Sequence, residues 1–163
     1  HRLDKETSGV LIIAKTREYA QLFTSLFRIR KMHKTYIALT YGKISKEIKT
    51  LRDDLITYEK DKKVVQKALS HIKILKCSSD YSYVELNPIT GRKHQLRKQL
   101  YNIGNPIIGD DKYFTNRRAD KMKIKNKNLM LHAYKIKFMI NNVQYNFKAE
   151  YGKDFEDFIK KSF

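Results

Sequence analysis

The spacing of apolar residues in the first part of the chain predicts a strand followed by a helix. An apolar run covers residues 10–15 directly after a Ser8-Gly9 turn, which predicts a buried strand. The apolar residues that follow recur three and four positions apart, as they do on one face of an amphipathic helix. These residues are Tyr19, Leu22, Phe23, Leu26 and Phe27. We interpret this stripe as part of the hydrophobic core.

Strand patterns dominate the middle of the chain. Residues 34–41 predict a strand, whereas residues 43–66 are polar and irregular and are expected to form an extended excursion. Residues 68–77 and 81–86 predict two strands joined by a turn at residues 78–80, which is typical of a hairpin.

The remaining part of the chain predicts two short helices and a second hairpin. The helices are expected at residues 94–101 and 154–160. The hairpin joins residues 129–140 to residues 143–149 through Asn141-Asn142, and alternation in its second arm predicts one buried and one solvated face. Many strands with few helices predict an α+β fold with a mixed, mainly antiparallel central sheet flanked by short helices.

Composition limits the possible classes of protein. The chain has 163 residues, 41% of them hydrophobic, which suits one domain over residues 1–163. No apolar run is long enough to span a membrane, and no signal peptide is evident. The single cysteine, Cys77, excludes an internal disulfide and is expected to be a core thiol in a reducing compartment. We therefore expect a cytoplasmic protein, with an organellar compartment left open.

The net charge of the chain says more about its binding partners than the rest of its composition does. The formal net charge is +18, from 35 Lys and Arg against 17 Asp and Glu. A field of this size favours a polyanionic partner, most commonly nucleic acid, although a lysine-rich surface that only interacts with water is the alternative. The five histidines are scattered without ligand spacing, and no phosphate-binding glycine loop or nucleophile elbow occurs. We therefore expect no metal site.

Two segments carry candidate chemistry. In the first, Asp4 lies between Arg2 and Lys5, whose positive charges favour an ionised carboxylate that can act as a nucleophile. In the second, a glycine turn precedes a basic helix on which His94 and Arg97 share one face, an arrangement suited to phosphate. A surface turn with offsetting charges and a solvated basic helix are the alternatives, and the charge pattern alone does not decide between them.

Four motifs in order resemble those of the RluA-type RNA pseudouridine synthases. HRLDKETSGVLIIAKT resembles the catalytic motif of this family, and NPITGRKHQLRKQLYNIGNPIIGDDKYF resembles its second signature. KTYIALTYG resembles the strand between them, and LMLHAYKIKF resembles the C-terminal strand. The resemblance implies the catalytic domain of an isomerase that detaches uracil from its ribose and rejoins it through carbon 5, without a cofactor.

The resemblance also implies roles for individual residues. Asp4 would be the catalytic carboxylate, Arg97 its cationic partner, and Tyr36 the residue that stacks on the uracil and serves proton transfer. Arg2 would help to extrude the base, and Ile13 and Leu131 are candidate pocket walls for which a plain core role is the alternative. The residues expected to bind RNA are Arg2, Arg92, Lys93, His94, Gln95 and Lys98.

The chain departs from the family pattern at two positions. Lys93 replaces a threonine and Gln99 replaces a histidine, and both are expected to change RNA contacts more than chemistry. Family members carry a further stretch before the catalytic motif, so we expect the catalytic domain to be N-terminally incomplete. We predict a monomeric RNA pseudouridine synthase acting on large-subunit rRNA, with tRNA as the second possible substrate. The alternative from another class is a non-catalytic RNA-binding or ribosome-assembly module.

Overall fold

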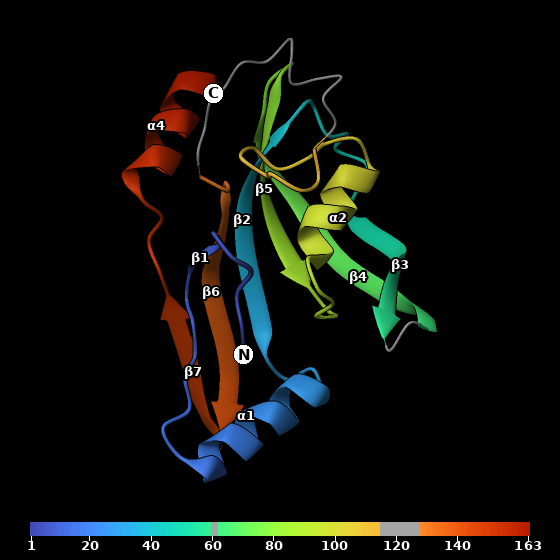
Figure 1. Cartoon of the computed structure of the whole chain (residues 1–163). Coiled ribbons are helices and arrows are strands. Elements are labelled where there is room, and N and C mark those ends of the chain that lie inside the picture. Colours follow the sequence, from blue (N-terminus) through green and yellow to red (C-terminus); the bar gives the residue numbers. More distant parts are fainter. Residues whose placement is uncertain (60–61, 115–127) are drawn as a thin grey trace.

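The fold is built on one central sheet. The computed structural model describes residues 1–59, 62–114 and 128–163 (Figure 1). Its seven strands follow the order β1-β6-β2-β5-β4-β3, and β7 pairs with β6. The strands are β1 (Ser8–Gly9), β2 (His33–Tyr41), β3 (Thr50–Glu59), β4 (Lys62–Cys77), β5 (Tyr81–Pro88), β6 (Leu131–Ile140) and β7 (Val143–Lys148). Only the β1–β6 pair is parallel, which confirms the predicted mixed, mainly antiparallel α+β fold.

Short helices flank this sheet, as predicted. Helix α1 (Arg17–Arg28) crosses the lower end of β2 and β6, α2 (Gln95–Asn102) lies beside β3, β4 and β5, and α4 (Lys153–Ser162) lies at the upper end (Figure 1). Helix α1 begins after Thr16, which has an extended backbone. The side-chain oxygen of Thr16 caps the helix by accepting the N–H of Tyr19 at 3.4 Å. No helix in the described part of the chain is long and apolar enough to cross a membrane.

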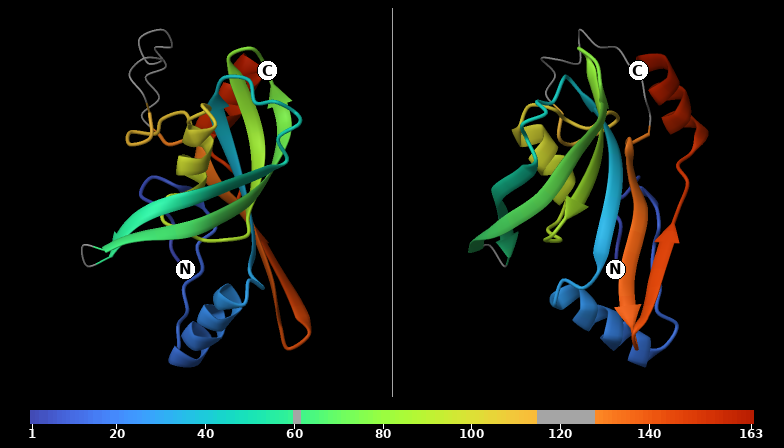
Figure 2. Two further views of the ribbon diagram at one scale, coloured as in Figure 1. Left: turned by 90° about the vertical axis from the view of Figure 1, so that its right-hand side faces the viewer. Right: turned by 180° about the vertical axis from the view of Figure 1, so that it is seen from behind.

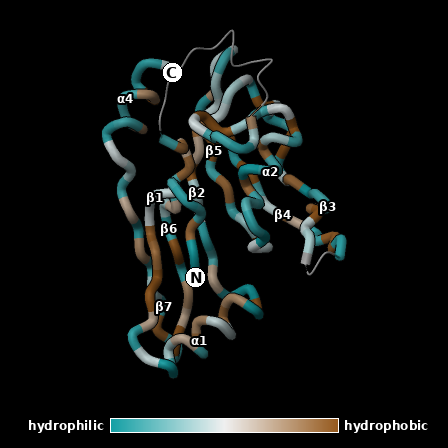
Figure 3. Tube along the Cα trace, in the orientation of Figure 1, coloured by the Kyte–Doolittle hydropathy of each residue, from teal (hydrophilic) through white to brown (hydrophobic). Residues whose placement is uncertain are grey.

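Two hydrophobic clusters hold the elements together. The larger one joins β2 and β5 to α2 and α4, with Leu39, Leu86 and Leu100 fully buried. The smaller one packs Leu26 of α1 against Phe138 of β6. Hydrophobic positions also recur along β6 toward α1 (Figure 3). Burying such side chains contributes about 1.5–3 kcal/mol each, so β2 and β5 form the rigid centre that supports the site.

The predicted strand at residues 10–15 is wrong. Strand β1 has only two residues, and after Val10 the chain leaves the sheet with Leu11 49% and Ile13 76% exposed. The reason is that β7 pairs with β6 from Lys135 onward and occupies the edge along which β1 would continue. Ile13 therefore forms neither a core contact nor a pocket wall.

The expected excursion over residues 43–66 is also wrong, because most of this stretch forms a hairpin. Strands β3 and β4 pair from Thr50 opposite His71 to Glu59 opposite Lys62, and the hairpin extends away from the rest of the sheet (Figure 2). Few of its side chains are buried, Leu51 and Leu55 among them, so the apolar pattern was too sparse to reveal a strand. Residues 60 and 61 lie outside the described part of the chain.

Two burial predictions need correction. Strand β7 has no buried face: Val143, Tyr145 and Phe147 are 53%, 37% and 49% exposed. It pairs with β6 at the edge of the sheet, and its two aromatic rings contact Phe138 and each other. Cys77 is half-buried at the end of β4 and is not a core thiol. Alternation alone could not reveal whether a second layer covers a strand.

Candidate active site

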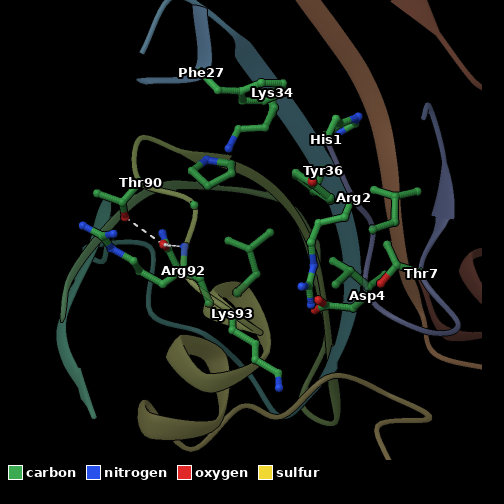
Figure 4. Close-up of a pocket in the computed structure, with 16 residues that line it drawn as sticks. His1, Arg2, Asp4, Thr7, Phe27, Lys34, Tyr36, Thr90, Arg92 and Lys93 are labelled. Carbon is green, nitrogen blue, oxygen red and sulfur yellow. Dashed lines mark hydrogen bonds between the residues drawn. The ribbon is translucent and has the colours of Figure 1, made fainter. Parts of the chain in front are cut away.

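A cavity of about 300 Å³ opens where three segments of the chain meet (Figure 4). The segments are the N-terminal stretch, the start of β2 and the loop between β5 and α2. The cavity is lined by His1, Arg2, Leu3, Asp4, Thr7, Phe27, Lys34, Tyr36, Pro88, Thr90, Gly91, Arg92, Lys93, Gln95, Leu96 and Leu131. Among these residues Asp4 is the only carboxylate, and four carry formal positive charge, so the cavity is suited to an anionic ligand with one carboxylate directed at it.

Asp4 is held by a short turn fixed to β6. Its carbonyl accepts the N–H of Thr7 at 3.0 Å, and Gly9 follows in a left-handed conformation with φ of +113°. A Cβ atom at Gly9 would lie 2.2 Å from the carbonyl oxygen of Ala133, so only glycine allows β1 to approach β6 this closely. Ser8 is also bonded through Oγ to Nδ1 of buried His132 at 2.7 Å. These contacts place the Asp4 side chain, which is 20% exposed, at the cavity wall.

The predicted pair between Asp4 and Arg97 is wrong in this structure. The guanidinium of Arg97 binds Asp110 in a bidentate arrangement, with both N···O distances at 2.7 Å, and also reaches exposed Asp111 at 3.2 Å. The hydrogen bonds that Arg97 donates to Asp110 raise the pKa of Arg97 against the effect of burial, and the charge of Asp4 raises it further. Arg97 thus contributes a positive field near Asp4 while its planar fork is occupied elsewhere.

Asp110 reaches Arg97 because a tight turn follows Gly109. Its Oδ1 also accepts the backbone N–H groups of Lys112 and Tyr113 at 2.9 Å each. Burial by itself would raise the pKa of Asp110, but the hydrogen bonds from Arg97 and from the two backbone groups lower it overall. The carboxylate is therefore ionised and fully partnered, which is what a buried charge requires.

The imidazole of His94 approaches the Asp4 carboxylate as a possible ion-pair partner. His94 Nε2 lies 3.9 Å from Oδ1 of Asp4, and its Nδ1 lies 2.9 Å from the hydroxyl of Tyr113. His94 is the residue before α2 and has φ of +54°, an uncommon conformation for a residue with a side chain. This backbone turn directs the imidazole toward Asp4.

Tyr36 lies on β2, at an irregularity in the pairing of β2 with β6 between Thr35 and Tyr36. Burial, together with the negative charge of Asp4, raises the pKa of Tyr36 to about 12. Its hydroxyl is therefore protonated at neutral pH. The ring and the hydroxyl of Tyr36 both belong to the cavity wall that contains Asp4 (Figure 4).

Comparisons with known proteins agree with this arrangement. The family profile described as "RNA pseudouridylate synthase" matches residues 1–102, which is more than half of the chain. The chain belongs to the RNA pseudouridylate synthase family. This confirms the family assignment made from the four sequence motifs.

Several relatives are similar over most of the chain. The chain is 38% identical over 148 residues to "Ribosomal large subunit pseudouridine synthase C" of Rickettsia bellii, covering 83% of this chain and 47% of the relative. It is 34% identical to "Ribosomal large subunit pseudouridine synthase D" of Borreliella burgdorferi, covering 98% and 50%. It is 35% identical to "tRNA pseudouridine synthase C" of Haemophilus ducreyi, covering 85% and 65%. The chain thus spans about half the length of the first two relatives and 65% of the third.

A solved structure shows the same fold. The human protein "RNA Pseudouridylate Synthase Domain Containing 4" superposes with a TM-score of 0.76 at 26% identity, covering 99% of this chain and 74% of that one. The match extends through the strands and helices described above, so it includes every element that contributes to the cavity.

The structure brings most of the predicted site residues of this family member together. Asp4 and Tyr36 line the cavity with Arg2, Arg92, Lys93 and Gln95, and Leu131 forms part of its wall. Arg97, His94 and Lys98 do not line it. Arg97 still interacts with Asp4 through its charge, and His94 approaches the Asp4 carboxylate.

Two glutamines expected to affect RNA contacts are used inside the protein. The side-chain oxygen of Gln95 accepts Oγ1 of Thr90 at 2.7 Å and the N–H of Arg92 at 3.0 Å, and its nitrogen donates to Leu69 and Ser70. Gln99 is fully buried and bonds Ser70 at 2.6 Å, so its expected influence on RNA contacts is wrong. Both amides fix α2 to the β3–β4 hairpin.

The sequence interpretation missed several residues of the site. Lys34 lines the cavity, and burial lowers its pKa. Alternation along β2 places Lys34 on the same face as Tyr36, so that signal was available. Asp110 and Tyr113 had no such signal, because their contacts depend on how the turn after Gly109 packs against α2. In the part of the chain that the structure describes, no group of three potential metal ligands occurs.

Proposed function

We propose that this chain carries the catalytic site of an RNA pseudouridine synthase, with Asp4 as its catalytic carboxylate. The observation that supports this most directly is that Asp4 is the sole carboxylate among the described residues lining a basic and apolar cavity. Family membership supports the reaction class, and the geometry around Asp4 supports the residue.

In the proposed reaction the bond between N1 of uracil and C1′ of ribose breaks, and a bond between C5 and C1′ forms. C5 then loses its proton and N1 gains one, so the atoms balance without an added reagent. The carboxylate of Asp4 attacks either the sugar or the base during the first step, and the bond it forms breaks again by the time the product is released, which regenerates Asp4. Tyr36 keeps its proton at neutral pH, so its hydroxyl can take part in proton transfer by donating this proton and accepting another. The ring of Tyr36 can stack on the uracil.

The wall of the cavity explains how an RNA substrate would be held. Arg2, Lys34, Arg92 and Lys93 surround the single carboxylate, and phosphate contacts of this kind supply affinity that falls with salt. Flipping a base out of a helix costs about a few kcal/mol, and those contacts offset that cost. Leu131 and Phe27 provide apolar surface for the flipped base.

We propose large-subunit rRNA as the first substrate to test and tRNA as the second. The names of the relatives from Rickettsia bellii and Borreliella burgdorferi support the first, and that of the Haemophilus ducreyi relative supports the second. The charged and apolar groups that line the cavity would suit a uridine nucleotide of either RNA class.

The test measures tritium release from RNA labelled with tritium at C5 of uridine, followed by carbodiimide mapping of pseudouridine. We expect Asp4→Asn to reduce the rate by about 10³-fold or more, because the substitution removes the attacking charge with little change of shape. RNA affinity, measured by filter binding, should stay close to that of the wild type. Asp111→Asn, at a 78% exposed carboxylate, is the matched control and should retain the wild-type rate.

Two outcomes would overturn the proposal. The first is tritium release that Asp4→Asn does not reduce. The second is folded wild-type protein that binds both RNAs and modifies neither, which would favour a non-catalytic RNA-binding module.

A further inference from the structure

The imidazole of His94 approaches the carboxylate of Asp4. The His94 side chain is 15% exposed, and it is absent from the residues that line the cavity. The left-handed backbone of His94, with φ of +54°, is strained for a residue with a side chain. Such strain at a site residue points to a function that requires this orientation of the imidazole.

The partners of the two ring nitrogens define one tautomer. An ionised carboxylate only accepts hydrogen bonds, so the nitrogen that faces Asp4, Nε2, is favoured as the one that carries the proton. Nδ1 is then an acceptor, and the Tyr113 hydroxyl 2.9 Å away can donate to it. The Tyr113 ring also packs edge-on against the imidazole at 5.6 Å between centroids, which holds the imidazole plane.

We propose that His94 is a positioning residue for Asp4: a neutral imidazole whose Nε2–H points at the carboxylate, with its tautomer set by a hydrogen bond from Tyr113. This inference rests on the proposed function of Asp4. The 3.9 Å separation is longer than a hydrogen bond, and hydrogen bonds of this kind commonly shorten when substrate is bound.

The charges around His94 keep the imidazole neutral. Burial lowers the pKa of His94, the charge of Asp4 opposes this, and the positive charges of Arg97, Lys112 and Lys93 lower it further. Burial also raises the pKa of Tyr113 against the effect of Arg97, so Tyr113 retains the proton that it donates.

Anchoring of Tyr113 connects His94 to Arg97. The backbone N–H of Tyr113 donates to Asp110, and the guanidinium carbon of Arg97 lies 5.2 Å from the centroid of the Tyr113 ring. The buried Arg97–Asp110 pair therefore supports the tyrosine that orients His94. Arg97 acts on Asp4 through its field and through this chain of contacts.

The test combines NMR with kinetics on the full chain. Nitrogen-15 NMR of the His94 ring at pH 7.5 should show protonated Nε2 and unprotonated Nδ1 in the wild type. Tyr113→Phe removes the donor, so we expect a mixture of tautomers and a kcat about 10-fold lower, with KM little changed. Tyr101→Phe, in the same aromatic group, is the matched control and should alter neither readout.

Conservative replacement of His94 provides the second part of the test. His94→Gln keeps an N–H donor near the position of Nε2 and should retain more kcat than His94→Leu. An Nδ1-protonated or doubly protonated ring in active wild-type protein would overturn the inference while leaving the proposed function intact. The same holds if Tyr113→Phe leaves both the tautomer and kcat unchanged. A wild type that shows the expected tautomer but has no Asp4-dependent activity would instead contradict the proposed function.

Discussion

The buried pair between Arg97 and Asp110 offers the sharpest test of how the site is held together. The side chains of Arg97 and Asp110 are 6% and 0% exposed, and their two hydrogen bonds are both 2.7 Å long. Asp110→Ala leaves the guanidinium buried without its main partner and removes the acceptor for the N–H groups of Lys112 and Tyr113. Breaking a buried pair in this way costs about 3–5 kcal/mol.

That loss is large compared with the stability of a typical domain, about 5–15 kcal/mol. For a chain of this size each kcal/mol lowers the melting temperature by about 2–4 °C, so we expect a decrease of about 6–20 °C. The measurements are thermal unfolding and urea unfolding at pH 7, both followed by far-ultraviolet circular dichroism. In urea we expect a lower midpoint with an unchanged slope. Asp110→Asn keeps an oxygen for the backbone N–H groups and should lie between Asp110→Ala and the wild type.

Asp111 provides a matched control on the same guanidinium. It lies 3.2 Å from Arg97 but is 78% exposed, so Asp111→Ala should change the free energy of unfolding by about 1 kcal/mol or less. Equal losses for Asp110→Ala and Asp111→Ala would refute the reasoning that burial makes the Asp110 pair important.

The pH dependence has a definite sign. The folded pKa of Asp110 is lowered, so its contribution is present above the unfolded value of about 3.9 and is lost as pH falls through the folded value. The difference in stability between the wild type and Asp110→Asn should therefore shrink as the solution is acidified below about pH 4.

Two further predictions concern Gly9 and Tyr36. Gly9→Ala places a Cβ atom 2.2 Å from the carbonyl oxygen of Ala133, and urea unfolding should show a loss of about 1–3 kcal/mol. Gly91→Ala, whose Cβ meets only an ordinary contact at 3.6 Å, should stay within about 0.5 kcal/mol, and equal effects would contradict the steric argument. The pKa of Tyr36 in the folded protein is raised to about 12. Its protonated hydroxyl therefore contributes stability that is fully present below about pH 10 and is lost as pH rises through about 12. Tyr36→Phe should therefore remove a transition near pH 12 from the ultraviolet titration of the tyrosines, and an unchanged titration would argue against burial of this hydroxyl.

Several features of this protein could be predicted from the sequence because they depend on neighbours along the chain. The helix over residues 17–28, the hairpin at Asn141-Asn142 and the helix after Gly91 follow from local spacing and turn residues. The order of the four motifs was sufficient to identify the family and to select Asp4 and Tyr36. These two residues indeed lie in one cavity.

Other features were decided only by tertiary packing. Strand β3 has too few apolar residues to be recognised, and it exists because β4 pairs along its full length. The run after Gly9 is as apolar as a buried strand, yet β7 occupies the edge of β6 that it would need. A strand requires a free partner edge as well as a suitable pattern, and the edge is a property of the whole sheet.

The partner of Arg97 shows the same division at the site. From the sequence by itself, the motifs predicted that Arg97 would pair with Asp4, and helical spacing predicted that His94 and Arg97 would share one face. Which acid takes the guanidinium depended on the turn after Gly109, which brings Asp110 into a bidentate position and leaves His94 facing Asp4. Charge attraction alone does not choose between two carboxylates, and the choice follows from burial and hydrogen-bond geometry that exist only in the folded chain.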